Sequence, residues 1–171
     1  CPSFTSLDKV KDYICNSPIC SGAQDVNQYA KGSFTGEISI NMLESIACKW
    51  VIVGHSERRS IMGETDEMIH LKLKQIVAKD LTPILCIGET IDERNAGMTE
   101  SVLKRQLSIA YKDIAVELLD KIVIAYEPVW AIGTGETATE NMVADTHCNI
   151  RSILRGNGLD GDGISIIYGG S

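Results

Sequence analysis

Short apolar runs alternate along the chain with segments of helical spacing. Five runs rich in β-branched and small residues predict strands near 19–23, 50–54, 83–88, 122–126 and 164–168. Between and before them, apolar residues recur every three or four positions, which predicts helices over 7–14, 39–49, 66–79, 99–111 and 140–154. Residues 3–6 and 25–36 are expected to be loops. Regular alternation of strand and helix predicts a parallel sheet.

Polar or glycine-rich residues follow the strands at their carboxyl ends. His55 follows the second strand, Glu89 the third, Glu127 the fourth and Gly169-Gly170-Ser171 the fifth. These ends share one face of a parallel sheet, so we expect one site there, as in a (β/α)8 barrel. A doubly wound sheet is the alternative, because it also binds ligands at carboxyl ends. The chain contains no G-x-G-x-x-G sequence to favour a dinucleotide.

The segment after the fourth strand has the composition of a base beneath a mobile lid. Glu127 stands where the strand ends, and Pro128 removes a backbone donor and stops the pairing. Residues 131–135 are small and glycine-rich. A rigid start and a flexible tip suggest a lid. On this segment alone, a solvated glutamate in a loop is an equally good interpretation.

Composition narrows the class of protein. The 171 residues are 44% hydrophobic, which is typical of one soluble globular domain. A net charge of −7 argues against nucleic acid or an anionic membrane as a partner. The six cysteines are scattered, without C-x-x-C or a Cys/His cluster of metal-binding spacing. We therefore expect no metal site and a reducing, cytoplasmic setting.

Three segments carry a resemblance to a known family: 51–59 (VIVGHSERR), 125–135 (AYEPVWAIGTG) and 168–171 (YGGS). They resemble signature segments of triose-phosphate isomerase, and shorter matches at 32–37 and 85–90 extend the similarity in order along the chain. The resemblance implies a TIM barrel. It also implies cofactor-free interconversion of dihydroxyacetone phosphate and D-glyceraldehyde 3-phosphate through an enediolate, in glycolysis and gluconeogenesis.

The resemblance assigns roles to individual residues. Glu127 matches the catalytic base, and His55 the neutral electrophile that polarises the carbonyl. Glu57 matches a third active-site residue; a surface carboxylate paired with Arg58 or Arg59 is the alternative. Substrate phosphate and lid positions match Ile132, Gly133 and Ser171, and the lid hinges and latch match Pro128, Val129, Trp130, Gly135, Ala138 and Tyr168.

Two further features follow from the resemblance. Thr35, Gly36 and Glu37 match the tip of an interdigitating loop that enters a partner subunit, which implies a homodimer. The second hinge begins with Glu136, where many relatives carry lysine, so lid kinetics are expected to differ. Cys86 lies within an apolar strand, and we interpret it as structural.

The resemblance runs from after the family's second strand to the loop after its seventh. We therefore expect a single domain over 1–171 that is part of a barrel, with N-terminal and C-terminal units missing, among them an active-site lysine. Five strands of eight do not close a barrel. Activity of the 171-residue chain by itself is accordingly doubtful, and a non-catalytic truncated barrel that serves binding or assembly is the alternative function.

Overall fold

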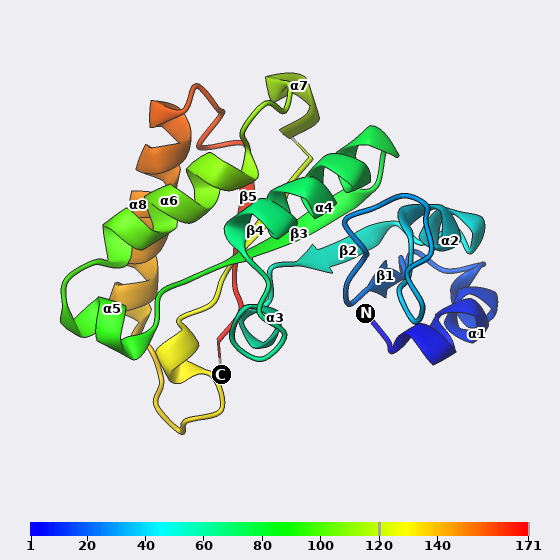
Figure 1. Ribbon diagram of the computed structural model, residues 1–171. Coiled ribbons are helices and arrows are strands. Elements are labelled where there is room, and N and C mark those ends of the chain that lie inside the picture. Colours follow the sequence, from blue (N-terminus) through cyan, green and yellow to red (C-terminus); the bar gives the residue numbers. More distant parts are fainter. Residues whose placement is uncertain (120, 171) are drawn as a thin grey trace.

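One parallel sheet organises the molecule in a computed structural model that describes residues 1–119 and 121–170. The five strands lie in the order β1-β2-β3-β4-β5, and every neighbouring pair is parallel (Figure 1). Their bounds are β1 Gly22–Ala23, β2 Trp50–Val53, β3 Thr82–Ile87, β4 Val123–Tyr126 and β5 Ser165–Tyr168.

Helices connect successive strands. The longer ones are α1 Phe4–Ile14, α4 Asp66–Ala78, α6 Thr99–Ala110 and α8 Glu140–Gly156. The shorter ones are α2 Ile40–Ser45, α3 Ser56–Ser60, α5 Ile91–Asn95, α7 Val116–Leu119 and the 3-10 helix η1 Val129–Ala131. None of the helices in the described ranges is long and apolar enough to cross a membrane.

Strand order decides between the two predicted architectures. Each strand pairs with the next one along the chain, whereas a doubly wound sheet reverses its order at a switch point. The sheet is therefore a partial (β/α) barrel, as predicted.

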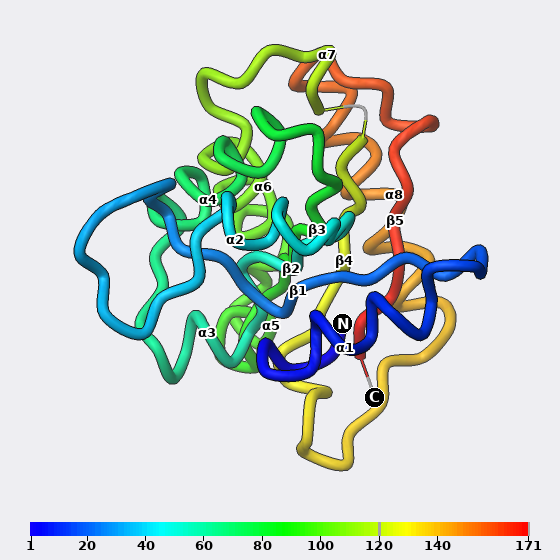
Figure 2. The backbone as a smooth tube through the Cα atoms, turned by 90° about the vertical axis from the view of Figure 1, so that its right-hand side faces the viewer, coloured from blue at the N-terminus to red at the C-terminus, as the bar shows by residue number. Residues whose placement is uncertain are grey.

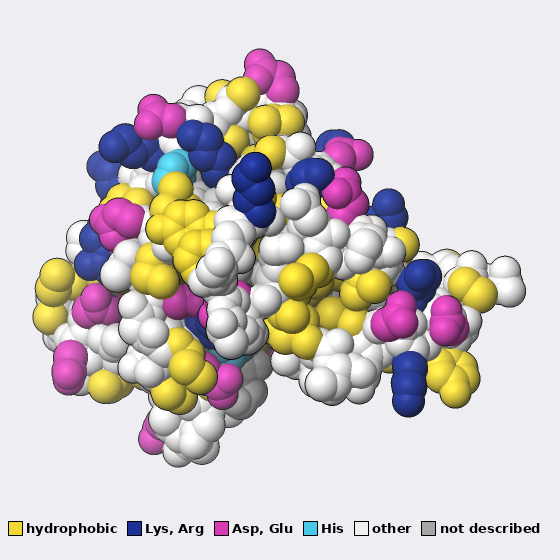
Figure 3. Space-filling view, turned by 45° about the vertical axis from the view of Figure 1, so that its right-hand side comes forward, with side chains coloured by type: hydrophobic (Ala, Val, Ile, Leu, Met, Phe, Trp, Pro, Cys, Tyr) yellow, Lys and Arg dark blue, Asp and Glu magenta, His cyan; other side chains and the backbone are white. Residues whose placement is uncertain are grey.

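The main core lies between the sheet and the helices α4, α6 and α8. Leu73 of α4, Leu107 of α6 and Ile150 of α8 are fully buried, as are Val51 and Leu85 of the strands they cover. Packed side chains of this kind fix the helices on the sheet. Both views show the segment after η1, drawn in yellow, projecting beside the end of β5 (Figure 1; Figure 2). A space-filling view shows charges of both signs scattered over one face (Figure 3).

Three predicted boundaries were wrong. Residues 3–6 are not all loop, because α1 begins at Phe4 after an extended Ser3. The helix expected over 39–49 ends at Ser45: Ala47 takes a left-handed conformation, with φ of 54°, and the chain turns there toward β2. The strand expected over 19–23 pairs only through its last two residues.

The helices α3, α5 and α7 and the 3-10 helix η1 were not predicted from the sequence. Four or five residues hold too little apolar periodicity to distinguish a helix from a turn. Only α5 carried a usable signal, because Thr90 and Glu93 form a capping box at its start.

Candidate active site

The carboxyl ends of β2 and β4 bring two predicted catalytic side chains together. Glu127, directly after β4, is 4% exposed, and its Oε2 accepts a hydrogen bond from the Ser56 backbone N–H at 2.9 Å. Its Oε1 lies 3.3 Å from His55 Nε2. A buried carboxylate with an imidazole and an amide as partners is not a solvated loop residue, so that alternative was wrong.

The hydrogen bonds of His55 assign its tautomer. His55 caps the first turn of α3, and its Nδ1 accepts the Glu57 backbone N–H at 3.3 Å. An imidazole nitrogen that accepts a hydrogen bond carries no proton, so the proton of the neutral ring is on Nε2, which faces Glu127. The site thus pairs a potential proton acceptor with a neutral N–H donor.

Glu57 lies at the mouth of this site. Its side chain is 71% exposed, and its Oε2 is 3.8 Å from His55 Nδ1. The arginines suggested as its partners bind elsewhere, since Arg58 pairs with Asp25 and Glu64, and Arg59 with Asp66. Within the described residues, Glu57 is therefore next to the imidazole and not part of a surface ion pair.

Cys86 is buried in β3, and its thiol is expected to be unreactive. Burial, and after it the negative charge of Glu127, raise the pKa of its thiol far above the ordinary value. A thiol that stays protonated is a poor nucleophile. This supports the structural interpretation.

Glu89 lies behind the site and anchors the turn η1, where the first lid hinge was predicted. It is fully buried, and its carboxylate accepts hydrogen bonds from Trp130 Nε1 at 3.1 Å and from the Tyr126 hydroxyl at 3.2 Å. Arg94 pairs with it at 3.0 Å, and the guanidinium carbon stands 4.6 Å from the centre of the Trp130 ring. Pro128 precedes this anchored 3-10 turn, and Val129 is its first residue.

Beyond η1 the lid segment is exposed and tightly turned. Gly133 and Gly135 have φ of 68° and 82°, values that favour glycine. Ile132 and Ala138, on either side of them, are half-buried. The segment that carries them projects beside the C-terminal end of β5 (Figure 1).

The end of β5 closes against Glu127. The Gly169 N–H donates to the Tyr126 carbonyl at 2.8 Å, and a Cβ at Gly169 would stand 3.1 Å from Glu127 Cγ. The hydroxyl of Tyr168 is buried, without a hydrogen-bond partner among the described residues. Ser171, predicted to bind phosphate, lies outside the described residues.

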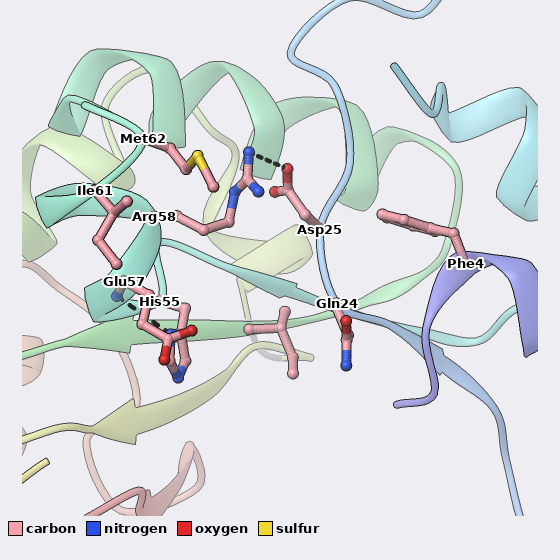
Figure 4. A pocket seen from close by; sticks show the side chains of 9 residues that line it. Phe4, Gln24, Asp25, His55, Glu57, Arg58, Ile61 and Met62 are labelled. Atoms are coloured by element: carbon pink, nitrogen blue, oxygen red, sulfur yellow. Dashed lines mark hydrogen bonds and ion pairs between the residues drawn. The ribbon is translucent and has the colours of Figure 1, made fainter. Parts of the chain in front are cut away.

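A cavity of about 320 Å³ opens beside His55 (Figure 4). Glu57, Arg58, Ile61 and Met62 border one side, and Ile61 and Met62 are 73% and 65% exposed. Two neighbouring large apolar side chains are thus exposed at the rim of this cavity.

The predicted interface loop is folded on itself. Asn27 Nδ2 donates to Glu37 Oε2 at 2.8 Å, and the rings of Tyr29 and Phe34 stack 4.8 Å apart. These contacts hold the loop that carries Thr35, Gly36 and Glu37, all of them exposed.

Sequence reasoning missed a buried cluster of ion pairs beside this cavity. Lys72 Nζ is 2.7 Å from Asp25 Oδ1 and also contacts Glu64, while Arg58 bridges the same two acids. Burial raises the pKa of Asp25, and the bond from Lys72 opposes that shift. A signal was present, because Lys72 falls on the apolar face of its helix between Ile69 and Leu73.

Comparisons with known proteins agree with this geometry. A family model described as triosephosphate isomerase matches residues 1–171. The chain belongs to the triosephosphate isomerase family. The triosephosphate isomerase of Roseiflexus castenholzii is 51% identical in an alignment over 174 residues. The alignment covers 100% of this chain and 68% of the relative.

Other members of the triosephosphate isomerase family agree over the same length. That of Roseiflexus sp. strain RS-1 is 49% identical, with 100% of this chain and 68% of the relative covered. That of Lawsonia intracellularis is 46% identical over 171 residues, 99% of this chain and 68% of the relative. These relatives support an isomerase and not the non-catalytic alternative.

Proposed function

We propose that Glu127 and His55 catalyse the interconversion of dihydroxyacetone phosphate and D-glyceraldehyde 3-phosphate. The Glu127 carboxylate takes a proton from the carbon next to the carbonyl, while the Nε2–H of His55 donates to the carbonyl oxygen, where enediolate charge develops. His55 passes its Nε2 proton to that oxygen and takes one back from the neighbouring hydroxyl oxygen, and Glu127 returns the carbon-bound proton to the neighbouring carbon, which completes the reaction. The proposal rests on one observation: Glu127 Oε1 lies against the Nε2–H of a neutral His55, whose Nδ1 accepts a hydrogen bond.

The remaining site residues take supporting roles in this proposal. Glu57 lies next to the imidazole at the mouth of the site. The segment with Ile132 and Gly133 closes over the substrate phosphate, together with Ser171. Pro128, Val129 and Trp130 form one hinge, Gly135 and Ala138 lie toward the other, and Tyr168 latches the closed lid.

Assembly and setting are part of the same proposal. The five strands are taken as neighbouring strands of a closed barrel, which agrees with the greater length of the relatives. Two copies form a homodimer, in which the tip at Thr35, Gly36 and Glu37 enters the partner's cavity beside His55. All six cysteines are free, which is compatible with a reducing, cytoplasmic compartment.

The test of the base is Glu127→Gln, made in the full open reading frame that encodes this chain. Glutamine keeps the size but cannot accept the proton, so kcat should fall by about 10²–10⁴ or more, while KM changes far less. Steady-state isomerase assays measure both constants. Glu117→Gln, at an exposed carboxylate on α7 and away from the proposed site, is the matched control and should keep the parent kcat. A Glu127→Gln enzyme within about tenfold of the parent would contradict the assignment.

A further inference from the structure

Gln106 makes an unusual pair of contacts behind the site. It lies on α6 between buried Leu103 and Leu107 and is itself only 5% exposed. Its Nε2 donates to the Gly88 carbonyl at 3.1 Å, and its Oε1 accepts the Gly88 N–H at 2.9 Å. One side-chain amide thus satisfies both backbone groups of one residue.

Strand geometry explains why Gly88 needs this partner. The backbone groups of a strand point alternately to its two neighbours, and the Thr82 N–H donates to Lys49 before β2. Gly88 lies an even number of residues after Thr82, so its N–H and carbonyl also point toward the β2 side. However, β2 ends at Val53, opposite Leu85, and Gly54 turns the chain away with φ of 72°. The Gln106 amide therefore occupies the place of the missing strand, since buried backbone groups need partners.

The opposite edge of this segment carries the base. The Glu127 N–H donates to the Ile87 carbonyl at 2.8 Å, and the Val129 N–H donates to the Glu89 carbonyl at 3.1 Å. A Cβ on Gly88 would stand 1.7 Å from the Glu127 carbonyl oxygen. The main chain of Glu127 thus rests directly on Gly88, with no side chain between them.

We propose that Gln106 is a positioning residue for the catalytic base. By holding Gly88 against β4, it fixes the main chain of Glu127 where the carboxylate meets both His55 and the Ser56 amide. The inference rests on the proposed role of Glu127. It adds a residue that touches neither substrate nor reacting atoms and acts through a backbone contact.

The first test is Gln106→Met, which keeps the length of the side chain and removes both hydrogen bonds. A displaced base should lower kcat by about 10²-fold, the cost of roughly 1 Å of misplacement. KM should change far less, because the substrate-binding residues stay in place. Assays use the full open reading frame, and circular dichroism checks the fold.

A second variant separates positioning from packing. In Gln106→Glu the new carboxylate can accept the Gly88 N–H but repels the Gly88 carbonyl. When protonated, the new carboxyl has one donor and one acceptor, like the amide it replaces. The ratio of its kcat to that of the parent should therefore rise as the pH is lowered from about 8 to about 5.5, since burial raises the pKa of a carboxyl. The same ratio for Gln106→Met should stay flat.

Leu107→Ala is the matched control for destabilisation. It hollows the core on the same helix without touching Gly88, so it should lower stability and keep kcat. If folded Gln106→Met keeps the parent kcat while Glu127→Gln is inactive, the positioning role is overturned and the base stands. If Glu127→Gln is itself active, the proposed function fails first. A flat ratio for Gln106→Glu together with a low kcat would also overturn the proposal, because it would leave packing as the cause.

Discussion

His147 on α8 is a residue whose protonation is linked to folding. Its ring packs edge-on against Tyr126, with centroids 6.1 Å apart, and its Nε2 is buried without a partner in the described part of the chain. Burial, and then the charge of Arg151, lower the pKa of His147. An unfolded histidine titrates near 6.5 and so takes up its proton at a higher pH than the folded one. Stability therefore falls as the pH drops through about 6.5 toward the lower folded pKa.

We expect His147→Phe to reduce this loss. Phenylalanine keeps an aromatic ring against Tyr126 and has no proton to take up in the unfolded state. Urea unfolding at about pH 7.5 and about pH 5.5 measures the free energy of unfolding of parent and variant on both sides of the histidine pKa. His55 and His70 are present in both proteins, so the difference isolates His147. Equal pH dependence in the two proteins would contradict the prediction.

At the scale of single residues, the sequence motifs identified the proposed catalytic pair, Glu127 and His55. They did not identify the backbone groups that hold this pair in place. Glu127 and His55 stand at strand ends inside long, specific segments, so the sequence alone predicted both. The contacts of the Ser56 amide and of the Gly88 backbone do not depend on side-chain type, so no sequence pattern indicates them. The sequence shows a polar Gln106 between Leu103 and Leu107, but it does not show which groups Gln106 binds. Such backbone contacts depend on where each strand ends, and the pattern of apolar and polar residues does not fix that point.

Among the elements, the turn η1, the proposed first hinge, depends on one buried carboxylate. Glu89 accepts hydrogen bonds from Trp130 and Tyr126 and pairs with Arg94, so three elements meet on one side chain. Glu89→Gln keeps the size but removes the charge. We expect a loss of about 1–3 kcal/mol in the free energy of unfolding, toward the lower end because Arg94 is 25% exposed.

Urea unfolding measures that loss, and Trp130 fluorescence reports whether the hinge turn has moved. Glu136→Gln, farther along the lid and exposed, should leave both readings unchanged. A Glu89→Gln protein as stable as the parent would show that solvent, and not this carboxylate, satisfies the hinge.

Element length decided which helices could be predicted. The cores of α4, α6 and α8 followed from long apolar periodicity, because three or more turns place enough residues on one face. The end of α2 did not, since a left-handed Ala47 violates local preference and is imposed by the path into β2. The four short helical turns are set by capping and by the loops that join them to strands, which tertiary context decides.

For the whole molecule, the proposed dimer joins the loop that carries Thr35 of one copy to the cavity beside His55 of the other. The cavity has an apolar rim at Ile61 and Met62, and its wall includes Arg58 paired with Asp25 (Figure 4). The loop is stiffened by its Tyr29–Phe34 stack and ends in an exposed tip. In a two-fold dimer each copy offers both features, so one substitution disturbs the interface twice.

We therefore expect Thr35→Arg and Met62→Lys each to shift the protein from dimer to monomer. The first adds a long charged side chain to a tip that must be buried in the partner's cavity, and the second places a charge in the apolar rim. Sedimentation over a range of concentrations measures the dimer affinity, and turnover should fall with it because the cavity borders His55 and Glu57. Tyr13→Lys, at an 88% exposed position on α1, is the control and should stay dimeric. A parent protein that is monomeric at micromolar concentration would contradict this mode of assembly. Unchanged dimer affinity in both variants would also contradict it, because neither added charge can enter that interface without weakening it.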